Sequence, residues 1–180
     1  TMDFIAYKVL EGVYSKLLNG EFDYPVFVFV EEAHKLVPSK KSTMSSEIIN
    51  TIATEGRKFG MFLVLITQRP SRINSESLSQ CNSQIILRIT NPVDQNAVRM
   101  ASERMSEELL RDLPGLNVGE AIIVGEVTKV PVMVKIRERR TMEGGADIDI
   151  VSKLRDARDE VRQGRGHEEF IRPSKMFSEV

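Results

Sequence analysis

The sequence predicts an α/β fold, a mostly parallel sheet flanked by helices, and three consecutive segments carry this prediction. Residues 26–30 and 61–66 are continuous apolar runs rich in β-branched and aromatic side chains, a composition typical of strands buried on both faces. Residues 45–58 between them have apolar side chains at helical spacing, with Ser45 or Ser46 as the expected N-cap. A strand, a helix and a strand in this order predict a βαβ unit with parallel strands.

Polar side chains follow both apolar runs at the point where each strand is expected to end. Glu31 and Glu32 follow the first run, and Thr67 and Gln68 follow the second. Because the carboxyl ends of parallel strands meet at one edge of a sheet, we expect all four residues to converge on one site. Two adjacent acids there suit nucleotide hydrolysis, and a Gln suits sensing of a γ-phosphate. The alternative is a buried strand that ends in a solvated acidic turn.

The composition describes an ordinary soluble globular protein, with 41% hydrophobic and 28% charged residues among 180. With 25 basic and 26 acidic residues the net charge is −1, so any contact with DNA must be a local patch. The single Cys81 excludes an intrachain disulfide and fits a reducing cytosol, where a small buried side chain is the simplest interpretation. No apolar run approaches the roughly 20 residues of a membrane span, so we expect a cytoplasmic protein without membrane contact.

The remaining elements divide the chain into residues 1–140, which hold all the predicted strands, and residues 141–180, a C-terminal helix and tail expected to contact another subunit. The tail, residues 164–180, is too polar to bury itself, so it is expected either to be disordered or to dock on a neighbour through Phe170 and Phe177. A helix is predicted over 3–19, with the buried stripe Phe4, Ile5, Val9, Leu10, Val13, Leu17 and Leu18. Two short helices within 92–113 are expected to open at Asn91-Pro92 and at Ser106. The other predicted elements are a strand over 84–90, hairpin or edge strands over 120–125 and 130–137, and a polar helix over 147–163.

The chain contains no phosphate-binding G-x-x-x-x-G-K-[ST] loop. Its glycine-containing stretches at 59–61, 144–145 and 164–166 have the wrong spacing and lack the Lys-Ser or Lys-Thr pair. Such a loop normally precedes the strand that ends in acids. We therefore expect this chain to be the C-terminal portion of a P-loop ATPase, inactive by itself because the β- and γ-phosphates would lack their loop.

Three motifs occur in one order and spacing: Phe-Val-Glu-Glu-Ala-His at 29–34, Glu-Gly-Arg-Lys-Phe-Gly at 55–60 and Thr-Gln-Arg-Pro-Ser at 67–71. Together they resemble the C-terminal half of the RecA-like core of the HerA family, hexameric DNA translocases related to FtsK that work with the nuclease NurA. The resemblance runs from about residue 24 to the hairpin near residue 137. It implies ATP and Mg²⁺ as cofactors, and double-stranded DNA, a homo-hexamer and a NurA-like nuclease as partners in DNA end processing and repair.

The resemblance also assigns roles at the ends of the two strands. Glu31 matches the Walker B acid that holds Mg²⁺ through water, and Glu32 matches the catalytic glutamate that polarises the attacking water. Gln68 matches the polar sensor at the end of the neighbouring strand. In P-loop enzymes generally the Mg²⁺ acid is Asp, and a Glu at position 31 reaches about one methylene further.

Three more residues are implied to contact nucleotide. Arg57 resembles an arginine that reaches nucleotide near a subunit boundary, and the alternative is a surface Arg favoured at a helix C-terminus by the dipole. Thr67 belongs with the strand-end residues that face the phosphates. Arg69 is either a second phosphate contact or a residue that positions its loop.

Two other functions remain open at this point. A conjugation or secretion motor of the VirB4 and TraG type shares the same acids at the strand end. A non-catalytic oligomerisation or DNA-binding module would retain the acids only for structure. The Glu-Glu-Ala-His motif is similar to the box of another helicase superfamily, but the further elements of that superfamily are absent. His34 is therefore predicted to begin a helix and to link the site to its surroundings, not to bind a metal.

Overall fold

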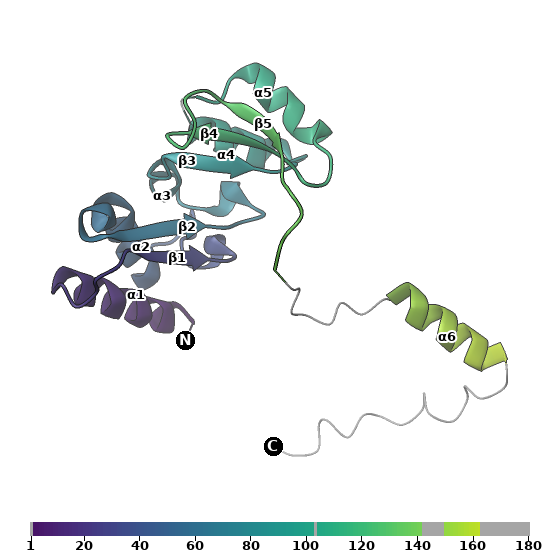
Figure 1. Ribbon diagram of the computed structural model, residues 1–180, viewed down its shortest axis with the longest axis horizontal. Coiled ribbons are helices and arrows are strands. Elements are labelled where there is room, and N and C mark those ends of the chain that lie inside the picture. The colour runs from purple at the N-terminus through teal and green to yellow at the C-terminus, as the bar shows by residue number, and fades with distance from the viewer. Residues whose placement is uncertain (1, 103, 142–149, 163–180) are drawn as a thin grey trace, which may run out of the picture. The chain divides into compact units, whose positions relative to one another are not determined.

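The centre of the N-terminal half is a parallel strand pair connected by a helix, as the sequence predicts. Strand β1 (Val26–Val30) pairs with β2 (Met61–Leu65) in parallel, and α2 (Met44–Glu55) crosses between them (Figure 1). Short 3₁₀ helices follow β1, α2 and β2; they are η1 (Ala33–Lys35), η2 (Gly56–Phe59) and η3 (Pro70–Arg72). The expected βαβ unit is confirmed, and its carboxyl ends are those occupied by Val30 and Leu65.

The computed structural model describes residues 2–102, 104–141 and 150–162. It divides into the units Thr1–Arg137 and Glu138–Val180, which are described separately. In the second unit, α6 (Ile150–Arg162) is the polar helix expected from the sequence. The tail with Phe170 and Phe177 lies outside the described residues. None of the described helices is long and apolar enough to span a bilayer.

Helix α2 begins one residue earlier than predicted because its N-cap is Thr43. The Thr43 hydroxyl accepts a hydrogen bond from the Ser46 amide at 3.1 Å, and the Ser46 hydroxyl accepts one from the Thr43 amide at 2.8 Å. This is a reciprocal capping box with Ser in place of the usual Glu or Gln. The predicted caps were therefore wrong: Ser46 completes the box from inside the helix, and the Ser45 hydroxyl donates instead to the Asp3 carboxylate of α1.

Among the described residues, β1 is covered on one face only, which corrects the expectation of burial on both. Val26, Val28 and Val30 point toward α1 and α2, where they join the core. Phe27 and Phe29, on the opposite face, are 60% and 65% exposed. Phe27 stacks on Phe62 of β2 with ring centroids 4.9 Å apart. The residues of α1 and α2 that pack on these valines belong to one core cluster, so the alternating side chains of β1 meet unlike surroundings.

Helix α1 (Met2–Leu18) buries a narrower stripe than the sequence predicts. Its buried residues are Leu10, Tyr14 and Leu17, and Val13 is partly buried. Four predicted stripe residues are exposed: Phe4, Ile5, Val9 and Leu18. The prediction missed Tyr14 because an aromatic residue with a hydroxyl was not counted as part of the apolar face. The predicted end is confirmed, since Gly20 has φ 70° and its amide donates to the Leu17 carbonyl at 3.0 Å.

The rest of the first unit is a three-stranded antiparallel sheet in the order β3-β4-β5, with its own apolar cluster. The expected hairpin is confirmed by the pairing of β4 with β5. Both predicted helix caps in this region are confirmed, because the side chains of Asn91 and Ser106 accept from the first-turn amides. The elements are α3 (Ser75–Ser79), β3 (Ser83–Ile86), α4 (Pro92–Met100), α5 (Glu107–Asp112), η4 (Leu113–Gly115), β4 (Glu120–Gly125) and β5 (Val132–Lys135). Strand β3 is shorter than the strand predicted over 84–90. The predicted α/β class is confirmed, with one parallel and one antiparallel sheet among the described residues.

Candidate functional site

The carboxyl ends of β1 and β2 are locked together by two backbone hydrogen bonds. The Ile66 amide donates to the Val30 carbonyl at 2.9 Å, and the Ala33 amide donates to the Ile66 carbonyl at 2.9 Å. The pairing therefore continues past the last strand residues and brings the acids after β1 beside the polar residues after β2. This edge of the sheet is where open α/β folds bind ligands.

Glu32 is the residue at which the chain leaves β1. It has φ 51° and ψ 41°, the left-handed conformation, and it is the only non-glycine residue with positive φ in the described part of the chain. Such a conformation is uncommon for a non-glycine side chain and is found where the surroundings enforce it. It ends the strand abruptly and starts η1.

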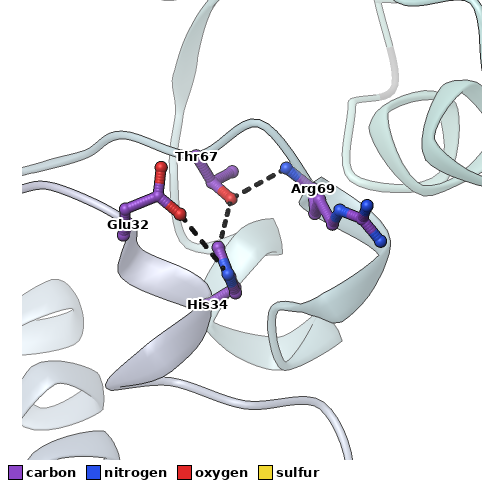
Figure 2. Close-up of polar contacts among 4 residues, drawn as sticks. All are labelled: Glu32, His34, Thr67 and Arg69. Carbon is purple, nitrogen blue, oxygen red and sulfur yellow. Dashed lines mark hydrogen bonds and ion pairs between the residues drawn. The ribbon is translucent and has the colours of Figure 1, made fainter. Parts of the chain in front are cut away.

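The Glu32 carboxylate contacts His34, two residues further along. Its Oε2 atom lies 3.4 Å from His34 Nε2, and the two side chains are 36% and 14% exposed. The other ring nitrogen, His34 Nδ1, lies 3.1 Å from the Thr67 hydroxyl. The Thr67 hydroxyl in turn accepts a hydrogen bond from the Arg69 amide at 3.0 Å. Figure 2 shows this continuous polar chain from Glu32 to Arg69.

The structure brings some predicted site residues into contact and leaves others apart. Glu32 and Thr67 are connected through His34. Glu31 and Gln68 are exposed, and neither side chain has a hydrogen bond or ion pair with any described residue. Arg69 contributes its backbone amide to the network, while its side chain is exposed. The sequence predicted that His34 links the site to its surroundings; that it connects the two strand ends became visible only with the fold.

Arg57 lies at the opposite end of the strand pair. It belongs to η2, directly before β2 starts, whereas Glu32 follows the end of β1. Five paired residues at roughly 3.3 Å each separate the two ends by about 17 Å. The structure therefore does not bring Arg57 together with Glu32 within one chain.

The Glu-Gly-Arg-Lys-Phe-Gly segment is fixed in place at its two glycines. A Cβ atom on Gly56 would lie 2.8 Å from the Met61 carbonyl oxygen and 2.9 Å from Ile52 Cγ2, so a larger residue would force these neighbours to move. Gly60 has φ 78°, the left-handed region that favours glycine, and its carbonyl accepts from the Val26 amide at 2.8 Å. The segment is thereby attached to the amino ends of β1 and β2.

Tyr14 of α1 packs against the same segment. Its ring meets Phe59 edge-on, with centroids 6.0 Å apart and an interplanar angle of 80°. Burial raises the pKa of the Tyr14 hydroxyl, and the charge of Glu55 and a hydrogen bond to that carboxylate raise it further. Tyr14 therefore stays protonated. Of the six residues in the motif, only Arg57 and Lys58 are exposed cations, and neither has an ion pair among the residues described.

The acids after β1 are a partial donor set for Mg²⁺. No group of three or more His, Cys, Asp or Glu side chains that could hold a metal occurs in the described ranges. Mg²⁺ at phosphate-transfer sites keeps several waters and takes one or two protein carboxylates together with phosphate oxygens. Glu31 has both carboxylate oxygens uncommitted at the strand end, so the residues present fit an ion that is also held by a nucleotide.

Comparison with known proteins decides the family. The family described as helicase HerA-like C-terminal matches residues 7–144. The chain belongs to this family. It is 47% identical over 123 residues to the DNA double-strand break repair helicase HerA of Pyrococcus furiosus, covering 68% of this chain and 22% of that protein. It is 44% identical over 131 residues to a probable helicase of Methanocaldococcus jannaschii, covering 73% and 26% respectively.

Among solved structures, the chain resembles the genome packaging NTPase B204 from Sulfolobus turreted icosahedral virus 2 in complex with ATP-γ-S. The two superpose with a TM-score of 0.58 at 18% identity, over 74% of this chain and 64% of that one. VirB4 of Thermoanaerobacter pseudethanolicus superposes with a TM-score of 0.56 at 18% identity, over 75% and 37%. These likenesses establish the ATPase-type α/β fold. The chain spans about a quarter of the length of the curated relatives it matches.

Proposed function

We propose that this chain is the C-terminal part of the ATPase core of a ring-forming, ATP-dependent DNA translocase or helicase that acts in DNA end processing. Membership of the HerA-like family supports this, as do relatives named double-strand break repair helicases. In this proposal the complete protein is a cytoplasmic homo-hexamer that moves double-stranded DNA and works with a NurA-like nuclease. Residues 1–140 form the partial core and residues 141–180 form a C-terminal helix and tail that contacts a neighbouring subunit.

The observation that carries the proposal is the pair of acids held at the carboxyl edge of the parallel strands. Glu32 is the general base for the attacking water, and Glu31 holds Mg²⁺ through water. Gln68, Thr67 and Arg69 face the phosphates of ATP from the end of β2. A bound Mg²⁺ would neutralise charge on the transferring phosphoryl group.

Arg57 acts on the nucleotide of a neighbouring subunit. Its separation from Glu32 along the strand pair, by about 17 Å, is too large for one site to use both from the same chain. In a ring built from head-to-tail contacts, the amino end of one strand pair can approach the carboxyl end of the next. Arg57 then stabilises the charge that develops on the phosphoryl group, as an arginine supplied from outside the site does in other NTPases.

The VirB4-type motor and the non-catalytic module are weaker alternatives. The likeness to VirB4 rests on fold at 18% identity, whereas the relatives named helicases are up to 47% identical. A non-catalytic module would assemble without hydrolysing ATP. In the experiment below only the non-catalytic module predicts a different outcome, because the VirB4-type motor shares the acids at the strand end.

The test uses the complete protein with Glu32→Gln, which keeps the size and polarity of the side chain but removes the base. Hydrolysis should fall by about 100-fold or more, the usual scale for a positioned base, while binding of a fluorescent ATP analogue and ring assembly stay unchanged. Glu126→Gln, in the exposed turn after β4, is the matched control and should leave turnover unaltered. Near-normal hydrolysis by Glu32→Gln would remove Glu32 from the mechanism and favour a purely structural role for the acids.

A further inference from the structure

Both ring nitrogens of His34 are engaged by residues from different strand ends. Nε2 faces the Glu32 carboxylate at 3.4 Å and Nδ1 faces the Thr67 hydroxyl at 3.1 Å (Figure 2). The imidazole is only 14% exposed, so water does not readily substitute for either contact. His34 is therefore the side chain through which the end of β1 and the end of β2 are connected.

The proton positions in this chain follow from counting donors. The Thr67 hydroxyl accepts from the Arg69 amide at 3.0 Å and has one hydrogen to donate. His34 Nδ1 is the ring acceptor within reach, so the neutral imidazole carries its proton on Nε2, the nitrogen that lies 3.4 Å from the Glu32 carboxylate. The opposite tautomer would point the lone pair of Nε2 at a carboxylate, a repulsive arrangement. The donors in this polar chain therefore all point the same way, from the Arg69 amide through Thr67 and His34 toward Glu32.

We propose that His34 is a positioning residue that sets the orientation of the Glu32 carboxylate and couples it to the segment after β2. This inference rests on the proposed function. His34 holds Oε2 of Glu32, which leaves Oε1 to take the proton of the attacking water. Because Thr67 starts the segment that faces the phosphates, a displacement of that segment is passed to Glu32 through the imidazole. His34 itself does not touch the reacting atoms.

Three substitutions of His34 in the complete protein separate positioning from packing. His34→Gln places an amide near the position of Nε2 and can still reach Glu32. His34→Asn is shorter, so its amide reaches only the position of Nδ1 beside Thr67. His34→Leu fills nearly the same volume with no hydrogen bond. If His34 only filled space, His34→Leu would be the least harmful of the three. If His34 positions Glu32, activity requires an N–H group facing the Glu32 carboxylate, which only His34→Gln retains.

The expected result is a reduction of kcat by about 10- to 100-fold in His34→Leu and His34→Asn, the scale of a small misplacement of a catalytic group, with the KM for ATP and the affinity for nucleotide unchanged. His34→Gln should recover to within about threefold of the unaltered protein. Thr67→Val should lower kcat as well, and the combination of Thr67→Val with His34→Leu should be less severe than the product of the two single effects. Thr51→Val, whose hydroxyl bonds only to its own helix, is the control.

Wild-type turnover in His34→Leu, or a His34→Gln protein as slow as His34→Leu, would overturn the proposal. If His34→Leu fails to assemble, the kcat values of His34→Gln and His34→Asn are compared instead. A higher kcat for His34→Gln would support the proposal, and equal kcat values would overturn it. The outcome is separate from that of the proposed function. Loss of hydrolysis in Glu32→Gln together with normal turnover in His34→Leu would reject only the positioning role.

Discussion

The two ends of the β1–β2 strand pair hold their charged side chains in opposite ways. At the carboxyl end, the Glu32 carboxylate is held within the chain by His34, which Thr67 supports. At the amino end, the backbone is held tightly while Arg57 and Lys58 are left exposed, with no ion pair in the described part of the protein. One end thus holds a carboxylate within the chain, and the other leaves two cations exposed at the surface.

This difference explains why the Glu-Gly-Arg-Lys-Phe-Gly motif at 55–60 carries both small and charged residues. Glycines and aromatic packing fix the backbone around Arg57, so little conformational freedom of the backbone is lost when its guanidinium finds a partner. A cation meant only for solubility would not need such support. The comparison therefore favours a role for Arg57 at a subunit boundary.

Removing the guanidinium should have the largest effect at the amino end. Arg57→Ala in the complete protein is expected to lower ATP turnover by about 1,000-fold or more, because the charge on the transferring phosphoryl group loses its partner. Arg57→Lys should not restore it, since an ammonium lacks the bidentate geometry. Turnover is measured by phosphate release with DNA present.

The control for this prediction is Lys58→Ala, the adjacent exposed cation on the same 3₁₀ helix. It should keep near-normal turnover. If both variants lost ATP turnover to the same extent, the segment would act through its net charge. If both kept normal turnover, the amino end of the strand pair would make no catalytic contribution.

Disturbing the backbone at the amino end should have an intermediate effect. Gly56→Ala forces a Cβ against the Met61 carbonyl and is expected to destabilise the core by about 1–3 kcal/mol, the typical cost of overpacking. Thermal unfolding and hydrogen exchange of peptides from α2 and β2 measure this. Gly12→Ala, where a Cβ meets nothing within 4 Å, should instead leave stability equal or slightly raised. A stable Gly56→Ala protein would show that this end is less tightly packed than described.

The smallest effect is expected at Asp3, which joins α1 to the start of α2. Its pKa is lowered by the Ser45 hydroxyl and amide, which donate to the carboxylate. A depressed native pKa adds stability above the ordinary value of 3.8 that is lost as the pH falls through the lower native value. Asp3→Asn should therefore speed hydrogen exchange in α1 at neutral pH, and the difference should vanish well below pH 3.8. Asp23→Asn, in an exposed loop, is the control and should show no such dependence on pH. If the faster exchange of Asp3→Asn persisted in acid, its cause would be the shape of the side chain and not its charge.

Much of the fold could be predicted because its signals are local. The apolar runs of β1 and β2 and the helical spacing of α2 are readable from neighbouring residues, and so are the caps at Asn91 and Ser106. Burial could not be predicted in the same way. Phe27 and Phe29 have the composition of buried strand residues, yet whether a second layer covers them depends on elements distant in sequence.

The site was predictable in its place but not in its contacts. Topology alone puts the residues after β1 and β2 at one edge, and the same topology puts Arg57 at the other edge. The link through His34 depends on the left-handed turn at Glu32, for which no local composition signal exists. Thr43 was overlooked as the cap because Ser46 at the third position is an unusual capping-box partner.

The most direct test of the division between the two ends is to mix Arg57→Ala subunits with Glu32→Gln subunits of the complete protein. Each variant alone should be inactive. If Arg57 serves the neighbour's site, a random ring contains interfaces that receive an intact Glu32 from one subunit and an intact Arg57 from the next, and about a quarter of the original turnover should return at equal mixing. No recovery at any ratio, with mixed rings demonstrated by mass spectrometry, would contradict the account.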